Sequence, residues 1–263
     1  MNYKDFFIQE FVVPILNYKY WMVLAETSIK QKYNRTILGP LWTTFSTLIQ
    51  VLSMGLVFTY LFQNKIERFL PYVTLGIIFW NFFTITITQG CYTFMTHKSY
   101  MIQFQKPIFI YVLVVLYQNK LIFLHNFVVF FGVAVLFDIY PSFLNLIQFI
   151  CNLFIVLLTL SWISLLVAII CVRFRDVPHI IGSLFTVLFW VTPIIYNPEQ
   201  LGNYAYLLNF NPLTHILELL RNCLLNQDIN AISYKYLFFF NIIGIYSTFL
   251  IFKKLKNFII FWV

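Results

Sequence analysis

Long apolar runs separated by short polar stretches dominate this chain of 263 residues. Six runs come close to or exceed the roughly twenty residues that a helix needs to cross a bilayer. They lie at 41–62, 70–92, 112–137, 143–171, 179–196 and 234–252. The fourth is long enough to tilt, and the fifth is short and ends in Pro193 and Pro198. The pattern predicts an all-α integral membrane protein whose six transmembrane helices form one domain, residues 41–263.

The third run carries two ionisable side chains, Lys120 and His125. Its apolar stretch begins near residue 108, so the span starts either there or close to Lys120, with a cytoplasmic helical extension before it. Lys120 is expected to snorkel to the cytoplasmic boundary. We interpret His125 as a hydrogen-bonded residue between helices and not as a proton relay.

Two stretches are too polar to span. From Tyr18 to Leu38 apolar side chains recur at helical spacing opposite Lys19, Glu26 and Lys30. This predicts an amphipathic helix in the cytoplasmic interface, within an N-terminal segment 1–40; the alternative is a solvated helix that packs on nothing. The external insertion 197–233 contains a predicted helix, Leu213–Leu225, that either dips into the outer leaflet or lies on the surface.

Composition excludes a water-surrounded domain and disorder, because 61% of the residues are hydrophobic and only 10% are charged. The net charge of +8 does not indicate nucleic-acid binding, since the cations flank the apolar runs. Twelve Lys and Arg residues fall on the side of the two termini and four on the other. Cytoplasmic loops carry the excess of cations, so both termini are predicted to be cytoplasmic.

Motifs for an energy source or an enzyme are missing from the sequence. It has no GxxxxGK[ST] phosphate loop, no HExxH and no GxSxG, and its four cysteines lack metal-ligand spacing. No acidic residue lies in the middle of a span, although carriers driven by ions need such groups. We therefore expect no cofactor or metal on this chain and a separate partner that supplies energy.

Polar residues share a face on the first two spans, where Gln50 and Asn81 are prominent. Aromatic residues join or flank these faces, among them Trp42, Trp80 and Phe82 on the first two spans and Trp190 and Tyr196 on the fifth. Polar faces in lipid either hold helices together or line a passage. Aromatic residues near span ends are equally compatible with anchors in the membrane interface.

Five motifs in order resemble the permeases of type-2 ABC exporters for bacterial cell-surface polysaccharides. They are KYNRTILGPLW at 32–42, LGIIFWNFF at 75–83, RFRDV at 173–177, FWVTPIIY at 189–196 and NFNPL at 209–213. The resemblance implies a homodimer in the bacterial inner (cytoplasmic) membrane that pairs with two copies of an ATPase. ATP and Mg then bind to the ATPase, and the cargo is a lipid-linked O-antigen, capsular or teichoic-acid polymer.

The resemblance also implies two sets of functional residues. In such permeases a short helix in the first cytoplasmic loop, here Tyr92–Pro107, docks into the ATPase. That places ATPase coupling on Thr96, His97, Lys98, Ser99 and Tyr100. The glycan passage of the family follows the dimer interface, and the matching positions here are Trp42, Gln50, Trp80, Asn81, Phe82, Trp190 and Tyr196.

Three other functions compete with this interpretation. An ABC permease for a drug or a lipid is disfavoured by the interface helix and the LGPLW motif. A membrane-embedded glycosyl or acyl transferase needs a carboxylate or histidine pair at the membrane surface, for which Asp176 is the nearest candidate. A structural membrane protein without cargo would not require the polar faces.

Overall fold

The computed structural model describes residues 2–34, 36–63, 65–104 and 106–263. Arg35, one of the predicted cytoplasmic cations and a position of the first motif, lies outside the described residues. Regular structure in the described ranges is helical. In chain order the helices are α1 (Tyr3–Phe7), α2 (Val13–Leu16), α3 (Tyr18–Tyr33), α4 (Leu41–Leu61), α5 (Ile66–Thr96), α6 (Lys98–Phe104), α7 (Phe109–Leu136), α8 (Phe143–Arg173), α9 (Val177–Val191), α10 (Pro212–Leu224) and α11 (Ala231–Trp262).

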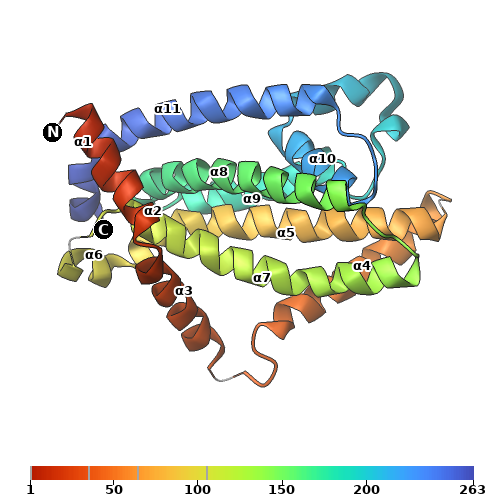
Figure 1. The fold of residues 1–263 in the computed structure, drawn as a ribbon, viewed down its shortest axis with the longest axis horizontal. Coiled ribbons are helices and arrows are strands. Elements are labelled where there is room, and N and C mark those ends of the chain that lie inside the picture. Colours follow the sequence, from red (N-terminus) through yellow and green to blue (C-terminus); the bar gives the residue numbers. More distant parts are fainter. Residues whose placement is uncertain (1, 35, 64, 105) are drawn as a thin grey trace.

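Five of these helices, α4, α5, α7, α8 and α11, are long and apolar enough to cross a membrane. They confirm the predicted all-helical membrane fold; α5, α7, α8 and α11 run roughly side by side, and α4 is inclined to them (Figure 1). Four of them begin earlier or end later than the apolar runs that revealed them, because polar residues can continue a helix beyond the lipid. In α11 the additional turns carry Lys253, Lys254 and Lys256.

The fifth predicted span is shorter than expected. The run 179–196 forms α9, which has 15 residues and ends at Val191, so it rises only about 22 Å against a hydrocarbon core of about 30 Å. Proline disfavours the helical conformation in the residue before it, and Thr192 is indeed extended (φ −91°, ψ 137°). The chain from Thr192 to Asn197 is non-helical, and the fifth run is thus an apolar helix followed by a bent, non-helical segment.

Helix α5 is the centre of the fold. In its most apolar stretch 83% of the residues are buried, compared with 17% for α4. It packs against α4, α7, α8, α9 and α10. At Gly76 the non-helical segment after α9 comes so close that an added Cβ would lie 2.7 Å from the carbonyl oxygen of Ile194. The second and fourth motifs therefore meet at a position where only glycine fits.

The N-terminal segment packs on the bundle. Helix α3 contacts α7, with the Trp21 ring 5.5 Å from that of Tyr117, so the alternative of a helix packed on nothing is wrong. It ends at Tyr33, short of the predicted Leu38. The helices before it, α1 and α2, and the π-helical turn Ile8–Val12 between them were not predicted. Their Phe6 and Phe11 rings pack against Phe252 of α11.

The insertion before the last span folds into a 3-10 segment, Pro198–Phe210, followed by α10. Asn211 starts α10 by accepting a hydrogen bond from the Leu213 amide at 3.0 Å, and Pro212 occupies the first turn. The predicted helix Leu213–Leu225 is therefore shifted by a single residue. Helix α10 is largely buried against α5, α8 and α11, at the end of the bundle opposite α1 and α6 (Figure 1).

Candidate functional site

Adjacent residues of α5 contact two different helices. The Asn81 side-chain amide donates to Oε1 of Gln50 on α4 at 3.1 Å. The Trp80 indole packs edge-on against Phe185 and Phe189 of α9, with ring centroids 5.8 and 5.6 Å away. We call this group of five residues the α4–α5–α9 contact. It brings three predicted passage residues together, with amides on one side of α5 and aromatic rings on the other.

Phe82 faces a third direction. It is 4% exposed and stacks on Phe123 of α7 at a centroid distance of 4.6 Å. A ring enclosed between α5 and α7 within one chain stays enclosed when a second chain is added. The geometry therefore argues against a lining role for Phe82 and makes it part of the core.

The two remaining tryptophans of the predicted passage are exposed. Trp42 lies in the first turn of α4 and is 48% exposed, and Trp190 lies in the last turn of α9 and is 59% exposed. Trp42 packs on Phe45, outside the α4–α5–α9 contact, whereas Trp190 packs edge-on against Phe189, a member of that contact, at a centroid distance of 5.4 Å. Both rings are thus accessible on the surface of a single protomer, to lipid or to a second protein chain.

Tyr196 belongs to a network that holds the non-helical segment after α9. Its hydroxyl donates to the carbonyl of Val191 at 2.9 Å, and its own carbonyl accepts from the Tyr72 hydroxyl at 3.0 Å. Arg221 of α10 donates from Nη1 to the Pro193 carbonyl at 2.8 Å, and its guanidinium lies 3.6 Å from the centroid of the Tyr72 ring. The Val191 carbonyl at the end of α9 thus finds a donor in Tyr196, and the Pro193 and Tyr196 carbonyls find donors in side chains of α5 and α10.

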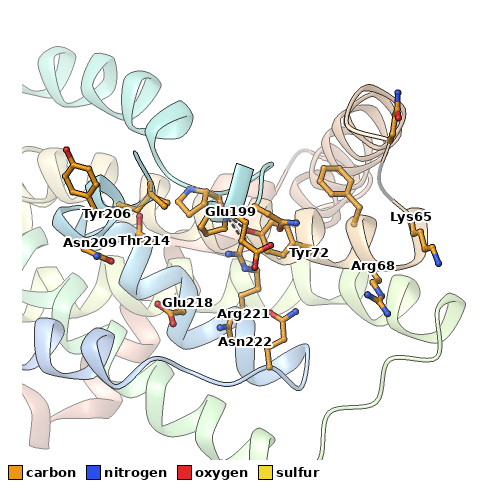
Figure 2. A pocket seen from close by; sticks show the side chains of 18 residues that line it. Lys65, Arg68, Tyr72, Glu199, Tyr206, Asn209, Thr214, Glu218, Arg221 and Asn222 are labelled. Carbon is orange, nitrogen blue, oxygen red and sulfur yellow. Dashed lines mark hydrogen bonds between the residues drawn. The ribbon is translucent and has the colours of Figure 1, made fainter. Parts of the chain in front are cut away.

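A polar pocket opens beside this network (Figure 2). Its volume is about 1010 Å³, and the start of α5, the chain after α9 and α10 line it. Lys65, Arg68 and Arg221 contribute cations, and Glu199 and Glu218 contribute carboxylates. Sequence reasoning missed this pocket, although a signal was present: Arg221 interrupts an otherwise leucine-rich face of the predicted helix.

The predicted coupling residues lie at the opposite end of the bundle, and the expected short helix is α6. Thr96, Lys98, Ser99 and Tyr100 are exposed there. His97, in contrast, is buried with its ring 5.2 Å from that of Tyr111, so it supports the segment from within.

Helix α6 is also tied to the last helix. The Lys98 ammonium donates to the carbonyl of Val263 at 2.7 Å, and Val263 directly follows α11. The exposed face of α6 and the end of α11 therefore form one continuous surface.

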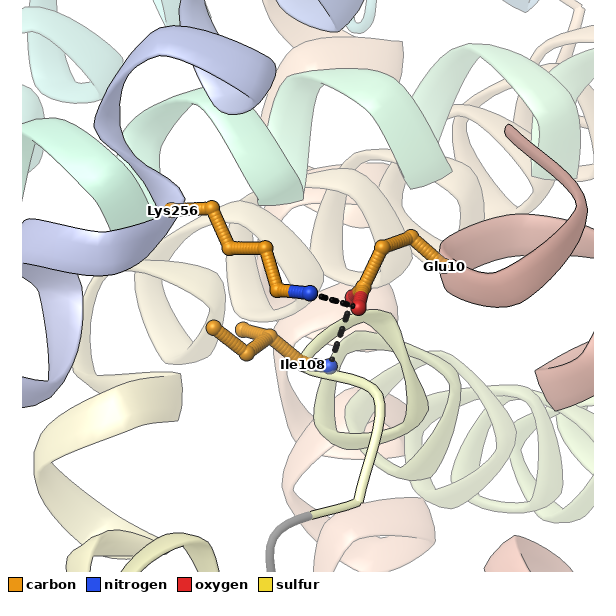
Figure 3. Close-up of polar contacts among 3 residues, drawn as sticks. All are labelled: Glu10, Ile108 and Lys256. Atoms are coloured by element: carbon orange, nitrogen blue, oxygen red, sulfur yellow. Dashed lines mark hydrogen bonds and ion pairs between the residues drawn. The ribbon is translucent and has the colours of Figure 1, made fainter. Parts of the chain in front are cut away.

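An ion pair with a buried carboxylate lies beside this surface (Figure 3). Glu10, from the π-helical turn, pairs with Lys256 of α11 and accepts a hydrogen bond at 3.0 Å from the amide of Ile108, next to the start of α7. The Glu10 side chain is almost fully enclosed. One carboxylate thus joins the N-terminal helices, α7 and α11.

These features define a multi-pass, all-helical membrane protein with a polar pocket at one end and the short, partly exposed helix α6 at the other. A family model for the ABC-2 type transporter matches residues 19–225. The chain belongs to this family, and all five motifs lie within the matched range. The resemblance to type-2 ABC exporter permeases is thereby confirmed.

Three similar proteins carry the name O-antigen export system permease protein RfbA. The one from Myxococcus xanthus is 22% identical over 197 residues, which cover 74% of this chain and 75% of that protein. Two from Klebsiella pneumoniae are 23% and 22% identical over 242 and 238 residues, in each case 89% of this chain and 91% of the relative. The similarity therefore extends along nearly the whole chain and supports a permease of the polysaccharide-exporting group.

Proposed function

We propose that this chain is the membrane subunit of an ATP-driven exporter that moves a lipid-linked cell-surface polysaccharide across the bacterial cytoplasmic membrane. Two copies form the passage, and two copies of a separate ATPase bind ATP and Mg and drive the cycle. The observation that carries the proposal is the similarity to three O-antigen export permeases along up to 89% of the chain. The α4–α5–α9 contact supplies the physical support.

The chemistry of this contact suits a glycan. Sugar rings present C–H faces that pack on aromatic rings, and their hydroxyl groups form hydrogen bonds with amides such as Gln50 and Asn81. Each such contact is weak, so a polymer can slide past a series of them. The absence of an acidic side chain from the contact also disfavours a cation as cargo.

Burial divides the tryptophans into two roles. Trp42 and Trp190 are exposed and are proposed to face the passage between two copies of the chain. Trp80 is only 5% exposed, so cargo reaches it only when α9 moves away from α5. In the closed conformation Trp80 instead holds α9 in position.

The test measures the amount of exported glycan per membrane-inserted permease molecule. This quantity distinguishes a residue that lines the passage from one that only packs between helices. Trp190→Ala removes one aromatic surface worth about 0.5–1.5 kcal/mol, so export should fall about two- to tenfold while membrane abundance stays the same. Trp80→Ala should reduce abundance as well, because it leaves a cavity beneath α9. The matched control is Phe239→Ala, which removes an exposed ring from α11. Equal export per molecule for the Trp190 and Phe239 variants would refute the aromatic passage.

A further inference from the structure

Arg221 is a buried cation without a carboxylate partner. The Arg221 side chain is 4% exposed. Among the described residues, the ion pair within 4.0 Å is that of Lys256 with Glu10, so no carboxylate pairs with Arg221 there. Its Nη1 bonds to the Pro193 carbonyl and its guanidinium packs on Tyr72, yet its Nε has no acceptor. Buried arginines are ordinarily paired, because an unpaired charge away from water is costly. Nε itself is enclosed, so an anion in the pocket would meet the outer N–H groups of the guanidinium.

The surroundings of Arg221 add further donors. Thr214, two turns earlier on the same face of α10, lines the same pocket, and its hydroxyl is enclosed without a partner. Lys65, just before α5, and Arg68, in its first turn, line the same pocket on the side away from Arg221 (Figure 2). The carboxylate of Glu218 is already engaged, since it accepts from the Asn230 amide at 2.9 Å and the Ser233 hydroxyl at 2.6 Å. Three cations thus line a pocket in which one of the two carboxylates is occupied.

We propose that this pocket binds a phosphate group at the end of the permease opposite α6. Arginine suits phosphate because its planar fork of N–H groups matches two phosphate oxygens at once. Lys65 and Arg68 supply additional charge for a dianion or pyrophosphate, and about 1010 Å³ leaves room for an attached sugar or headgroup. The phosphate comes either from the lipid-linked cargo, which rests on the proposed function, or from a membrane phospholipid, which does not.

The first experiment measures inorganic pyrophosphate binding to the purified full-length chain in a zwitterionic detergent by calorimetry. The variants are Lys65→Gln combined with Arg68→Gln, both on exposed positions where folding is not at risk, and Arg221→Lys, which keeps the charge but loses the fork. Each should weaken binding about tenfold or more, as expected for lost charge-assisted hydrogen bonds. Lys235→Gln is the matched control, since Lys235 is exposed on α11 and does not line the pocket. No binding by the unaltered chain, or equal binding by the double variant, would overturn the site.

A second measurement identifies the source of the phosphate. If a phospholipid occupies the pocket, nanodiscs containing phosphatidylglycerol should weaken pyrophosphate binding more than nanodiscs of phosphatidylcholine alone. If the cargo supplies the phosphate, both lipids should give the same affinity and the Lys65/Arg68 double variant should export less glycan per inserted molecule. Pyrophosphate binding is measured without any export assay. A chain that exports no glycan could therefore still bind pyrophosphate, and the two proposals can be refuted independently.

Discussion

His97 is a buried histidine at the junction between α5 and α6. Its Nδ1 lies 2.8 Å from the Thr93 carbonyl oxygen, and Tyr111 covers the ring. Burial lowers the pKa of His97 below its ordinary value of 6.5, and the bond to Thr93 offsets part of this effect. Below that pH the unfolded chain therefore binds a proton that the folded chain excludes.

The consequence for stability has a definite sign. The contribution of neutral His97 is fully present above the unfolded pKa and declines as the pH falls below about 6.5, by at most about 1.4 kcal/mol per pH unit. We expect the unfolding temperature of the purified protein to drop between about pH 7 and pH 5, and His97→Gln to flatten this drop. His179→Gln, at an exposed position of α9, is the control. An undiminished pH dependence in the His97 variant would assign the effect to other groups.

Helices were predictable from the sequence where they lie in lipid, because residues there must be apolar. The apolar run 41–62 corresponds to α4, and Asn211-Pro212 marks the start of α10 in both sequence and structure. The ends of α5 and α11 were not predictable, because hydropathy locates the part of a helix inside lipid and helix-forming residues continue beyond it. The break after α9 was visible in the sequence only as Pro193.

The candidate site was predictable in part for a related reason. Helical periodicity places Gln50 and Asn81 on polar faces, and these residues do meet. It cannot tell which neighbouring helix a face meets, so Phe82 was assigned to the passage although it packs against Phe123 of α7. Tyr72 and Arg221 were missed because their partners are backbone carbonyls, which sequence patterns do not reveal.

The close approach of the non-helical segment after α9 to α5 depends on Gly76. A Cβ added at residue 76 would lie 2.7 Å from the carbonyl oxygen of Ile194 and 3.2 Å from Cγ2 of the same residue. Gly76→Ala therefore pushes the backbone at Ile194 away from α5. We expect it to lower the free energy of unfolding by about 1–3 kcal/mol, as overpacking does elsewhere. Gly132→Ala on α7 should be neutral or slightly stabilising, because nothing lies within 4 Å of its added Cβ. Denaturation of both variants in one detergent tests this, and equal stability would contradict the close contact.

The molecule as a whole has two unlike ends, and their orientation in the membrane can be measured. The excess of cations predicts that α6 and α11's last turns face the cytoplasm. In a cysteine-free background, Lys98→Cys should react with a membrane-impermeant maleimide only after cells are opened, and co-expressed ATPase should slow that reaction. Lys235→Cys, expected on the other side, should react in intact cells with or without the ATPase. Labelling of residue 98 from outside would reverse the orientation, and unchanged labelling with ATPase present would remove α6 from the docking surface.

The pair between Glu10 and Lys256 also constrains the order of events during synthesis. Glu10 leaves the ribosome before any span, whereas Lys256 follows all of the other described helices. The Glu10 carboxylate must stay hydrated until α11 is in place, because burying this charge without Lys256 would carry a large desolvation penalty. Final docking of α1 and α2 is thus deferred until translation has passed α11. Nascent chains stalled before residue 256 should accordingly remain open to protease cleavage near Glu10, a sensitivity that completed chains lose.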